Sequence, residues 1–205
     1  MTKEAVNTGR RRFLTLSTTV VGGVGAGFWA WPFIASLAPS EKAKALGGPV
    51  TIDVSKLEPG QMVQSAWRKQ PIWVIRRTPE MIASLDKVTN RLVDPDGTKY
   101  VQQPDYIKGA TRSIKPEYMV LSGVCTHLGC SPKFRPDHPA PEIDAGWEGG
   151  FFCPCHGSKF DLSGRVFQGV PAPKNLLVPP YRFQGDNTIV IGEDAGETKT
   201  KTGVG

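Results

Sequence analysis

Two short stretches, CTHLGC at residues 125–130 and CPCHGS at residues 153–158, decide which fold the sequence favours. They hold all four cysteines of the 205-residue chain and two of its three histidines. A structural zinc site usually takes like ligands from each loop, such as two cysteines from one and two histidines from the other. Here each loop offers a Cys–His pair. Mixed pairs fit a two-metal cluster, in which each loop binds the inner metal through sulfur and the outer metal through imidazole.

One further cysteine remains in each loop once these pairs are assigned. In an exported protein, two spare thiols held close together would oxidise to a disulfide and tie the loops to one another. A zinc-binding module remains a non-redox alternative for the same residues.

The two motifs and their local spacing resemble the Rieske 2Fe-2S proteins. The resemblance implies a mostly β fold, with an antiparallel β-sandwich head and a small cluster-binding subdomain whose loops are residues 124–131 and 152–159. It also implies one 2Fe-2S cluster. The implied assignments are Cys125 and Cys153 on one iron, His127 and His156 on the other, and a Cys130–Cys155 disulfide.

Among Rieske proteins, the chain is similar over most of its length to the iron-sulfur subunit of the bacterial cytochrome bc complex. It includes GVPAP at residues 169–173, which resembles the family's proline loop but carries an extra Val170. The gap of 25 residues between His127 and Cys153 is long for Rieske oxygenases and their ferredoxins. A Rieske subunit of another periplasmic oxidoreductase, such as arsenite oxidase, is the alternative.

The resemblance to the bc subunit implies an oxidoreductase function and a set of partners. The chain would take an electron and a proton from ubiquinol and pass the electron to cytochrome c1, in a dimeric complex with cytochrome b. His127 and His156 are the candidate hydrogen acceptors, because an imidazole that binds iron through one nitrogen exposes the other. We expect no nucleic-acid partner, since the net charge of +6 forms no basic stripe interleaved with aromatic residues.

Four further residues have roles implied by the resemblance. Leu128 would pack against the quinol pocket of cytochrome b, and Ser158 would donate its hydroxyl to a bridging sulfide. Phe160 stands where many members have a tyrosine whose hydroxyl donates to the sulfur of Cys153. Pro171 belongs to the proline loop, which covers the cluster. His138 lies in a proline-rich insertion, and we assign it only a surface position.

The N-terminal region predicts an export signal and a membrane anchor. GRRRFLT at residues 9–15 resembles a twin-arginine signal, and no charged residue occurs in the 28 positions from 13 to 40. A run of this length can cross a hydrocarbon core of about 30 Å. We therefore expect a cytoplasmic arm at 1–12 and a single-pass anchor at 13–39 in the bacterial inner membrane. The cluster domain would lie in the periplasm.

We expect the anchor to be retained after export. Ala43-Lys44-Ala45 fits an A-x-A cleavage site superficially, but the apolar run is much longer than the hydrophobic region of an ordinary signal peptide. Trp29 and Trp31 lie near its outer end, where indoles favour the membrane interface. Cleavage would instead release the head from the membrane.

The remainder of the chain predicts a hinge at 40–49, a head domain at 50–195 and a disordered tail at 196–205. Short apolar runs separated by Pro, Gly or Asp indicate antiparallel strands. One exception is residues 78–88, where Thr78 can cap a short helix that begins at Pro79. The predicted strand regions are 49–57, 70–77, 116–124, 149–154, 176–183 and 187–193.

Overall fold

The computed structural model describes residues 7–40, 43 and 47–196. The chain divides into two units, one ending at residue 45 and one beginning at residue 46, and each has its own structure. Residues 1–6 of the predicted arm, half of the predicted hinge and nearly all of the predicted tail lie outside the described residues. Two of the three residues at the rejected cleavage site also lie outside them.

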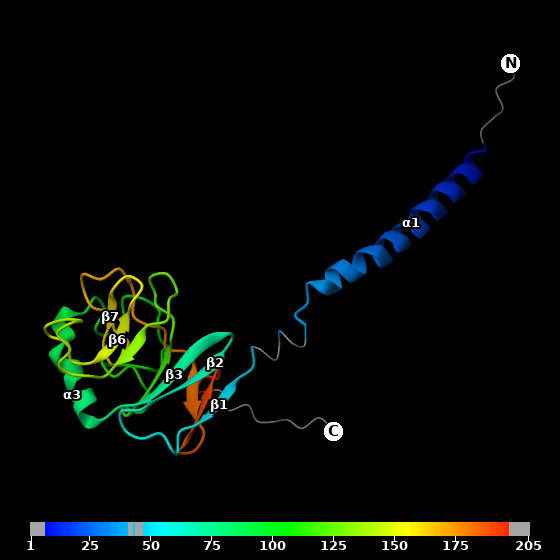
Figure 1. Cartoon of the computed structure of the whole chain (residues 1–205). Coiled ribbons are helices and arrows are strands. Elements are labelled where there is room, and N and C mark those ends of the chain that lie inside the picture. Colours follow the sequence, from blue (N-terminus) through cyan, green and yellow to red (C-terminus); the bar gives the residue numbers. More distant parts are fainter. Residues whose placement is uncertain (1–6, 41–42, 44–46, 197–205) are drawn as a thin grey trace. The chain divides into compact units, whose positions relative to one another are not determined.

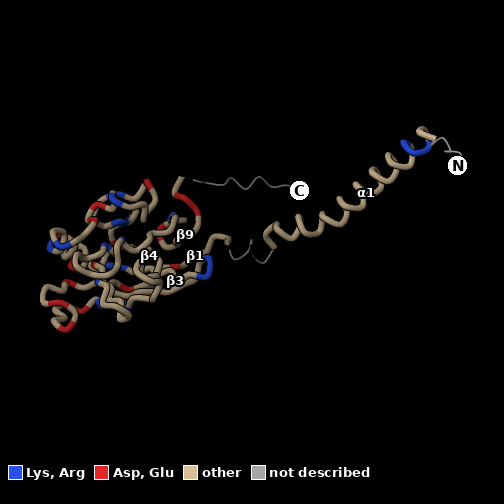
Figure 2. Tube along the Cα trace, turned by 90° about the horizontal axis from the view of Figure 1, so that it is seen from above, with Lys and Arg blue, Asp and Glu red and all other residues tan. Residues whose placement is uncertain are grey.

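The first unit contains the long helix α1 (Thr8–Ser36), of 29 residues. It begins where the side chain of Asn7 accepts a hydrogen bond from the Arg10 amide at 3.1 Å, which satisfies one of the free N–H groups of the first turn. Its apolar part has a mean hydropathy of 1.3, so its length and composition allow it to cross a membrane. Its basic residues are confined to the N-terminal end (Figure 2).

The second unit contains three antiparallel sheets of three strands each (Figure 1). Their strand orders are β1-β9-β8, β2-β3-β4 and β5-β6-β7. This confirms the expected mostly β, antiparallel head. The strands are β1 (Val50–Asp53), β2 (Met62–Trp67), β3 (Gln70–Arg76), β4 (Tyr118–Ser122), β5 (Lys133–Arg135), β6 (Gly150–Cys153), β7 (Ser158–Phe160), β8 (Tyr181–Phe183) and β9 (Thr188–Ile191).

Strands β5, β6 and β7 form a small sheet that carries the second metal loop, as expected for a cluster-binding subdomain. A continuous hydrophobic core joins this sheet to the other two. At the junction, Trp73 of β3 stacks on Phe151 of β6, with ring centroids 5.2 Å apart and ring planes 11° apart. All five residues of β4 are buried, which explains why its sequence is an apolar run without alternation.

One short helix, α3 (Pro79–Lys87), confirms the predicted exception to the β pattern. Thr78 caps it by accepting a hydrogen bond from the Met81 amide at 3.3 Å. The helix leads through the 3-10 turn η1 (Thr89–Arg91) toward a second, smaller apolar cluster. That cluster fastens the insertion before β6 to the head, and its buried members are Val88, Leu92, Ala140, Trp147 and Phe167.

Candidate metal centre

The two ligand loops connect neighbouring strands of the head. The first loop follows β4 and leads to β5, and the second is the tight turn from β6 to β7. Cys153 is the last residue of β6 and pairs in register with Ser158, the first residue of β7. The sheet therefore fixes both ends of the second loop.

Each loop is closed by an equivalent backbone hydrogen bond, from a glycine amide to the carbonyl of the cysteine four residues earlier. The Gly129 amide donates to the Cys125 carbonyl at 3.0 Å, and the Gly157 amide donates to the Cys153 carbonyl at 3.0 Å. Both glycines have left-handed backbone, with φ of +84° and +76°. Glycine adopts this conformation without the steric cost that a Cβ brings. The two loops therefore turn back in the same way after their first cysteine.

The two free thiols of the described residues lie together inside the head. Cys125 is 3% exposed and Cys153 is 2% exposed. The pKa of the Cys125 thiol is raised, mainly by burial and further by the neighbouring Cys153 thiol. Hydrogen bonds from the His127 backbone and the Ser158 hydroxyl lower it in part. A raised pKa keeps the thiol protonated without a metal, so metal binding must release the proton.

The two imidazoles lie toward the surface of the same site. The rings of His127 and His156 meet edge to face with centroids 4.8 Å apart. His156 is exposed and His127 is half-buried, while Leu128 beside it is 71% exposed. The site thus presents sulfur on its inner side and ring nitrogen on its outer side.

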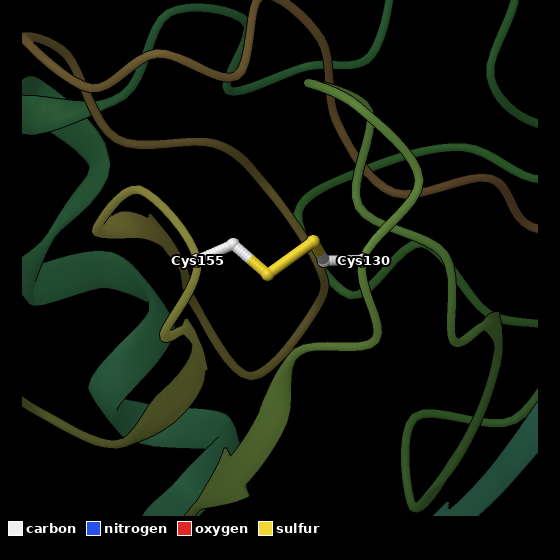
Figure 3. The surroundings of a disulfide bond; sticks show 2 residues. All are labelled: Cys130 and Cys155. Atoms are coloured by element: carbon white, nitrogen blue, oxygen red, sulfur yellow. A yellow bond between two sulfur atoms is a disulfide. The ribbon is translucent and has the colours of Figure 1, made fainter.

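A disulfide joins Cys130 to Cys155 and bridges the two loops, with the Cα atoms 6.7 Å apart (Figure 3). This is the predicted pairing. The sulfurs of both residues and of Cys153 lie within 4.8 Å of one another, so the bridge packs directly against one of the two free thiols. Because the bridged sulfurs cannot ligate as thiolates, two thiols and two imidazoles remain as donors. That donor set fits a Rieske 2Fe-2S cluster.

The remaining predicted residues lie around the thiols or on the surface. Ser158 and Phe160 are fully buried in β7. Pro171 is exposed in the proline loop. His138 is half-exposed; its Nδ1 lies 2.9 Å from the Trp147 carbonyl, and the structure does not bring it into the donor set.

Contacts to the proline loop were missed by sequence reasoning. The Thr126 hydroxyl donates to the Lys174 carbonyl at 2.6 Å, which joins the first loop to the residue that follows the proline loop. The Ala172 amide donates to the Ser158 Oγ at 3.1 Å, which joins the second loop to its middle. The first contact had a weak signal, a threonine between two ligands. The second had none, because it uses a backbone N–H.

Three nearly fully buried arginines were also missed, and they hold the turn that follows β7. Arg165 pairs with Asp161 at 2.7 Å, and Arg112 donates to the Ser163 carbonyl at 2.9 Å. Arg77 donates to the Ser163 hydroxyl at 2.7 Å. Buried charges of this kind require such partners. The sequence DLSGR, with two charges around a Ser-Gly turn, was the available signal.

Comparison with known proteins gives matches along most of the chain. Residues 1–40 match the family model "Ubiquitinol-cytochrome C reductase Fe-S subunit TAT signal", and residues 49–182 match "Rieske [2Fe-2S] domain". The chain is also similar to a solved structure entitled "Hyperthermophilic respiratory Complex III", at 27% identity and a TM-score of 0.47. That match covers 85% of this chain and 98% of the other.

Two curated relatives have the same name, ubiquinol-cytochrome c reductase iron-sulfur subunit. The protein of Allochromatium vinosum is 54% identical over 96% of this chain and 94% of its own length. The protein of Blastochloris viridis is 41% identical over 89% of this chain and 92% of its own length. With these relatives and a Rieske domain over residues 49–182, the chain belongs to the family of ubiquinol-cytochrome c reductase iron-sulfur subunits.

Proposed function

We propose that this chain is the Rieske subunit that accepts an electron and a proton from ubiquinol and passes the electron to cytochrome c1. The observation that carries the proposal is the arrangement of the donor set, with thiols buried and imidazoles at the surface. An electron carrier of this kind needs a buried anchor for its metals and an accessible edge for its redox partners.

Cys125 and Cys153 would hold the inner iron, and His127 and His156 the outer iron. When bound, the cluster supplies a one-electron acceptor whose potential is raised because two neutral imidazoles replace two thiolates. An imidazole that binds iron through one nitrogen has its second nitrogen free to take a proton. The exposed His156 and the half-buried His127 are both placed to receive the proton of a quinol that docks from outside.

Leu128 would provide an apolar contact for the docking partner. Its side chain is 71% exposed, and it follows His127 directly in the first loop. An apolar side chain next to a proton-accepting imidazole excludes water from the contact and suits the quinol pocket of cytochrome b. The neighbouring disulfide holds this loop against the second one.

The chain topology would then place the head where both partners can reach it. The arm carrying Arg10, Arg11 and Arg12 would stay in the cytoplasm, α1 would cross the membrane once and the head would lie in the periplasm. A hinge at 40–49 would let the head move from cytochrome b to cytochrome c1. We further propose that the assembled complex is a dimer.

Affinity purification of the full-length chain from membranes tests this function. We expect cytochrome b and cytochrome c1 to copurify, with two irons and two acid-labile sulfides per chain. Copurification of a molybdenum-containing arsenite oxidase subunit instead would support the alternative. Zinc without sulfide would contradict both redox assignments.

A further inference from the structure

The proline loop has only one backbone donor at its centre. In the sequence Pro171-Ala172-Pro173, both prolines lack an N–H, so Ala172 supplies the sole amide hydrogen. Both prolines are exposed, whereas Ala172 is 2% exposed and belongs to the same apolar core as the two free cysteines. The loop thus directs its single donor toward the metal site.

The Ala172 amide donates its hydrogen bond to the hydroxyl oxygen of Ser158. The Ala172 amide lies 3.1 Å from the Ser158 Oγ, and Ser158 is fully buried. A hydroxyl has one proton and two acceptor lone pairs. Because Ala172 occupies a lone pair, the proton must point elsewhere, and no oxygen acceptor lies within reach of it in the described part of the chain. Ser158 is the cross-strand partner of Cys153, so its hydroxyl lies on the face of the small sheet that carries the Cys153 thiol.

The residues after the proline loop are fixed by side chains from other parts of the head. The Lys174 carbonyl accepts the Thr126 hydroxyl at 2.6 Å. The Asn175 side chain accepts from the Val166 amide at 2.8 Å and donates to the Asp94 carbonyl at 2.9 Å. These contacts hold the chain that follows Ala172 in place and so restrict the position of its amide.

We propose that Ala172 is a positioning residue, whose amide orients the Ser158 hydroxyl toward the sulfur atoms of the centre and so raises its reduction potential. This inference rests on the proposed ligands Cys125 and Cys153. A hydroxyl that accepts a hydrogen bond is a stronger donor, because linked hydrogen bonds polarise one another. The reduced centre holds one more electron, so a stronger donor to its sulfur favours reduction.

The decisive test compares Ala172→Pro with Ala172→Gly in the full-length, cluster-loaded protein in detergent. Proline removes the amide hydrogen and glycine keeps it. We expect a lower midpoint potential in Ala172→Pro and a potential near that of the parent in Ala172→Gly, with equal iron and sulfide content. In a Ser158→Ala background, Ala172→Pro should lower the potential no further. A parental potential in Ala172→Pro, or an equal drop in both backgrounds, would overturn the proposal.

A second measurement applies if Ala172→Pro does not fold. A peptide spanning residues 169–173 keeps its label only at the Ala172 amide, because both prolines lack an N–H and the Val170 amide next to the new N-terminus exchanges back rapidly. Hydrogen exchange followed by mass spectrometry therefore reports on the Ala172 amide alone. We expect faster exchange at this amide in Ser158→Ala than in the parent. Unchanged exchange would overturn the proposal. If the parent itself held no iron–sulfur cluster, the proposed ligand set would be wrong, which is a distinguishable result.

Discussion

Phe160 lies on the same face of the small sheet as the proposed ligand Cys153. Cys153 pairs with Ser158 and Phe151 pairs with Phe160, so all four side chains leave the same face of β6 and β7. Cys153 and Phe160 are diagonal neighbours, at a separation that an aromatic side chain can bridge. This register supports the expectation that a tyrosine hydroxyl at position 160 would reach the Cys153 sulfur.

We therefore expect Phe160→Tyr to raise the midpoint potential. A hydrogen bond to the thiolate draws off negative charge and favours the reduced cluster. A difference of about 1 kcal/mol between redox states corresponds to roughly 40 mV for a one-electron couple. Voltammetry of the full-length protein in detergent measures the shift.

Phe152→Tyr is the matched control for this prediction. Phe152 precedes Cys153 on the opposite face of β6 and is half-buried. Its hydroxyl would point away from the ligand sulfur, so its potential should equal that of the parent. An unchanged or lowered potential in Phe160→Tyr would show that ring position 160 does not face Cys153.

The candidate ligands could be predicted from the sequence, because metal chemistry restricts residue types and spacing together. Cys125, His127, Cys153 and His156 therefore stand out without any structure. The role of Ala172 could not be predicted, since a backbone amide leaves no trace in a side-chain pattern. Only the fold brings it within 3.1 Å of Ser158.

Among the structural elements, the two ligand loops depend most on the disulfide. Loops contain few core residues that could hold them together. We expect the double variant Cys130→Ser with Cys155→Ser, which leaves no odd thiol, to lose its cluster faster than the parent. Its midpoint potential should also fall, because a looser site weakens the hydrogen bonds to the sulfurs that favour the reduced state. Absorbance decay during incubation at raised temperature measures retention.

The control is the parent protein incubated with a thiol-specific reagent. Both of its free cysteines are buried, so the reagent should leave its cluster lifetime unchanged. Equal cluster lifetime and equal potential in parent and double variant would refute the role assigned to the bridge.

The insertion before β6 is held to the head by an ion cluster around Asp144. The Lys159 ammonium of β7 contacts the Asp144 carboxylate, and Arg91 donates to it at 2.6 Å. The bond from Lys159 lowers the pKa of Asp144 well below its ordinary value. A lowered folded-state pKa means that the charged form stabilises the fold above the unfolded pKa of about 3.9 and that this contribution fades as the pH falls further.

We expect Asp144→Asn to lower the thermal unfolding midpoint at pH 7 by about 2–4 °C, which is the usual shift for a loss of about 1 kcal/mol in a chain of this size. The difference from the parent should persist down to about pH 4 and shrink below it. Calorimetry across this pH range measures both. Asp186→Asn is the control, because Asp186 is 96% exposed and its ion pair is worth little. A penalty independent of pH would contradict the account.

The sequence predicted the strands that carry runs of buried apolar residues. The predicted regions contain β1, β3, β4, β6, β8 and β9, although β8 occupies only the end of its region. Strands β2, β5 and β7 were missed. β5 and β7 have three residues each, too few for any period, and β2 lies at a sheet edge with only one buried residue. Their pairing partners, not their own sequences, make them strands.

At the scale of the whole molecule, the account requires that α1 stay attached to the head. Its 29 residues exceed the length needed to span a membrane. We expect the mature protein to remain in the membrane fraction through an alkaline wash. N-terminal sequencing should show residues of the predicted arm. A mature N-terminus near Leu46 would mean that the helix is a cleaved signal.

The central claim is that this chain carries electrons from ubiquinol toward cytochrome c. Its most direct test is the rate of ubiquinol-dependent cytochrome c reduction in membranes of the source bacterium from which this chain has been deleted. The account predicts that the rate is lost on deletion, returns with the parent chain and does not return with Cys125→Ser, which lacks a ligand. An undiminished rate in the deletion membranes, or full recovery with Cys125→Ser, would contradict it.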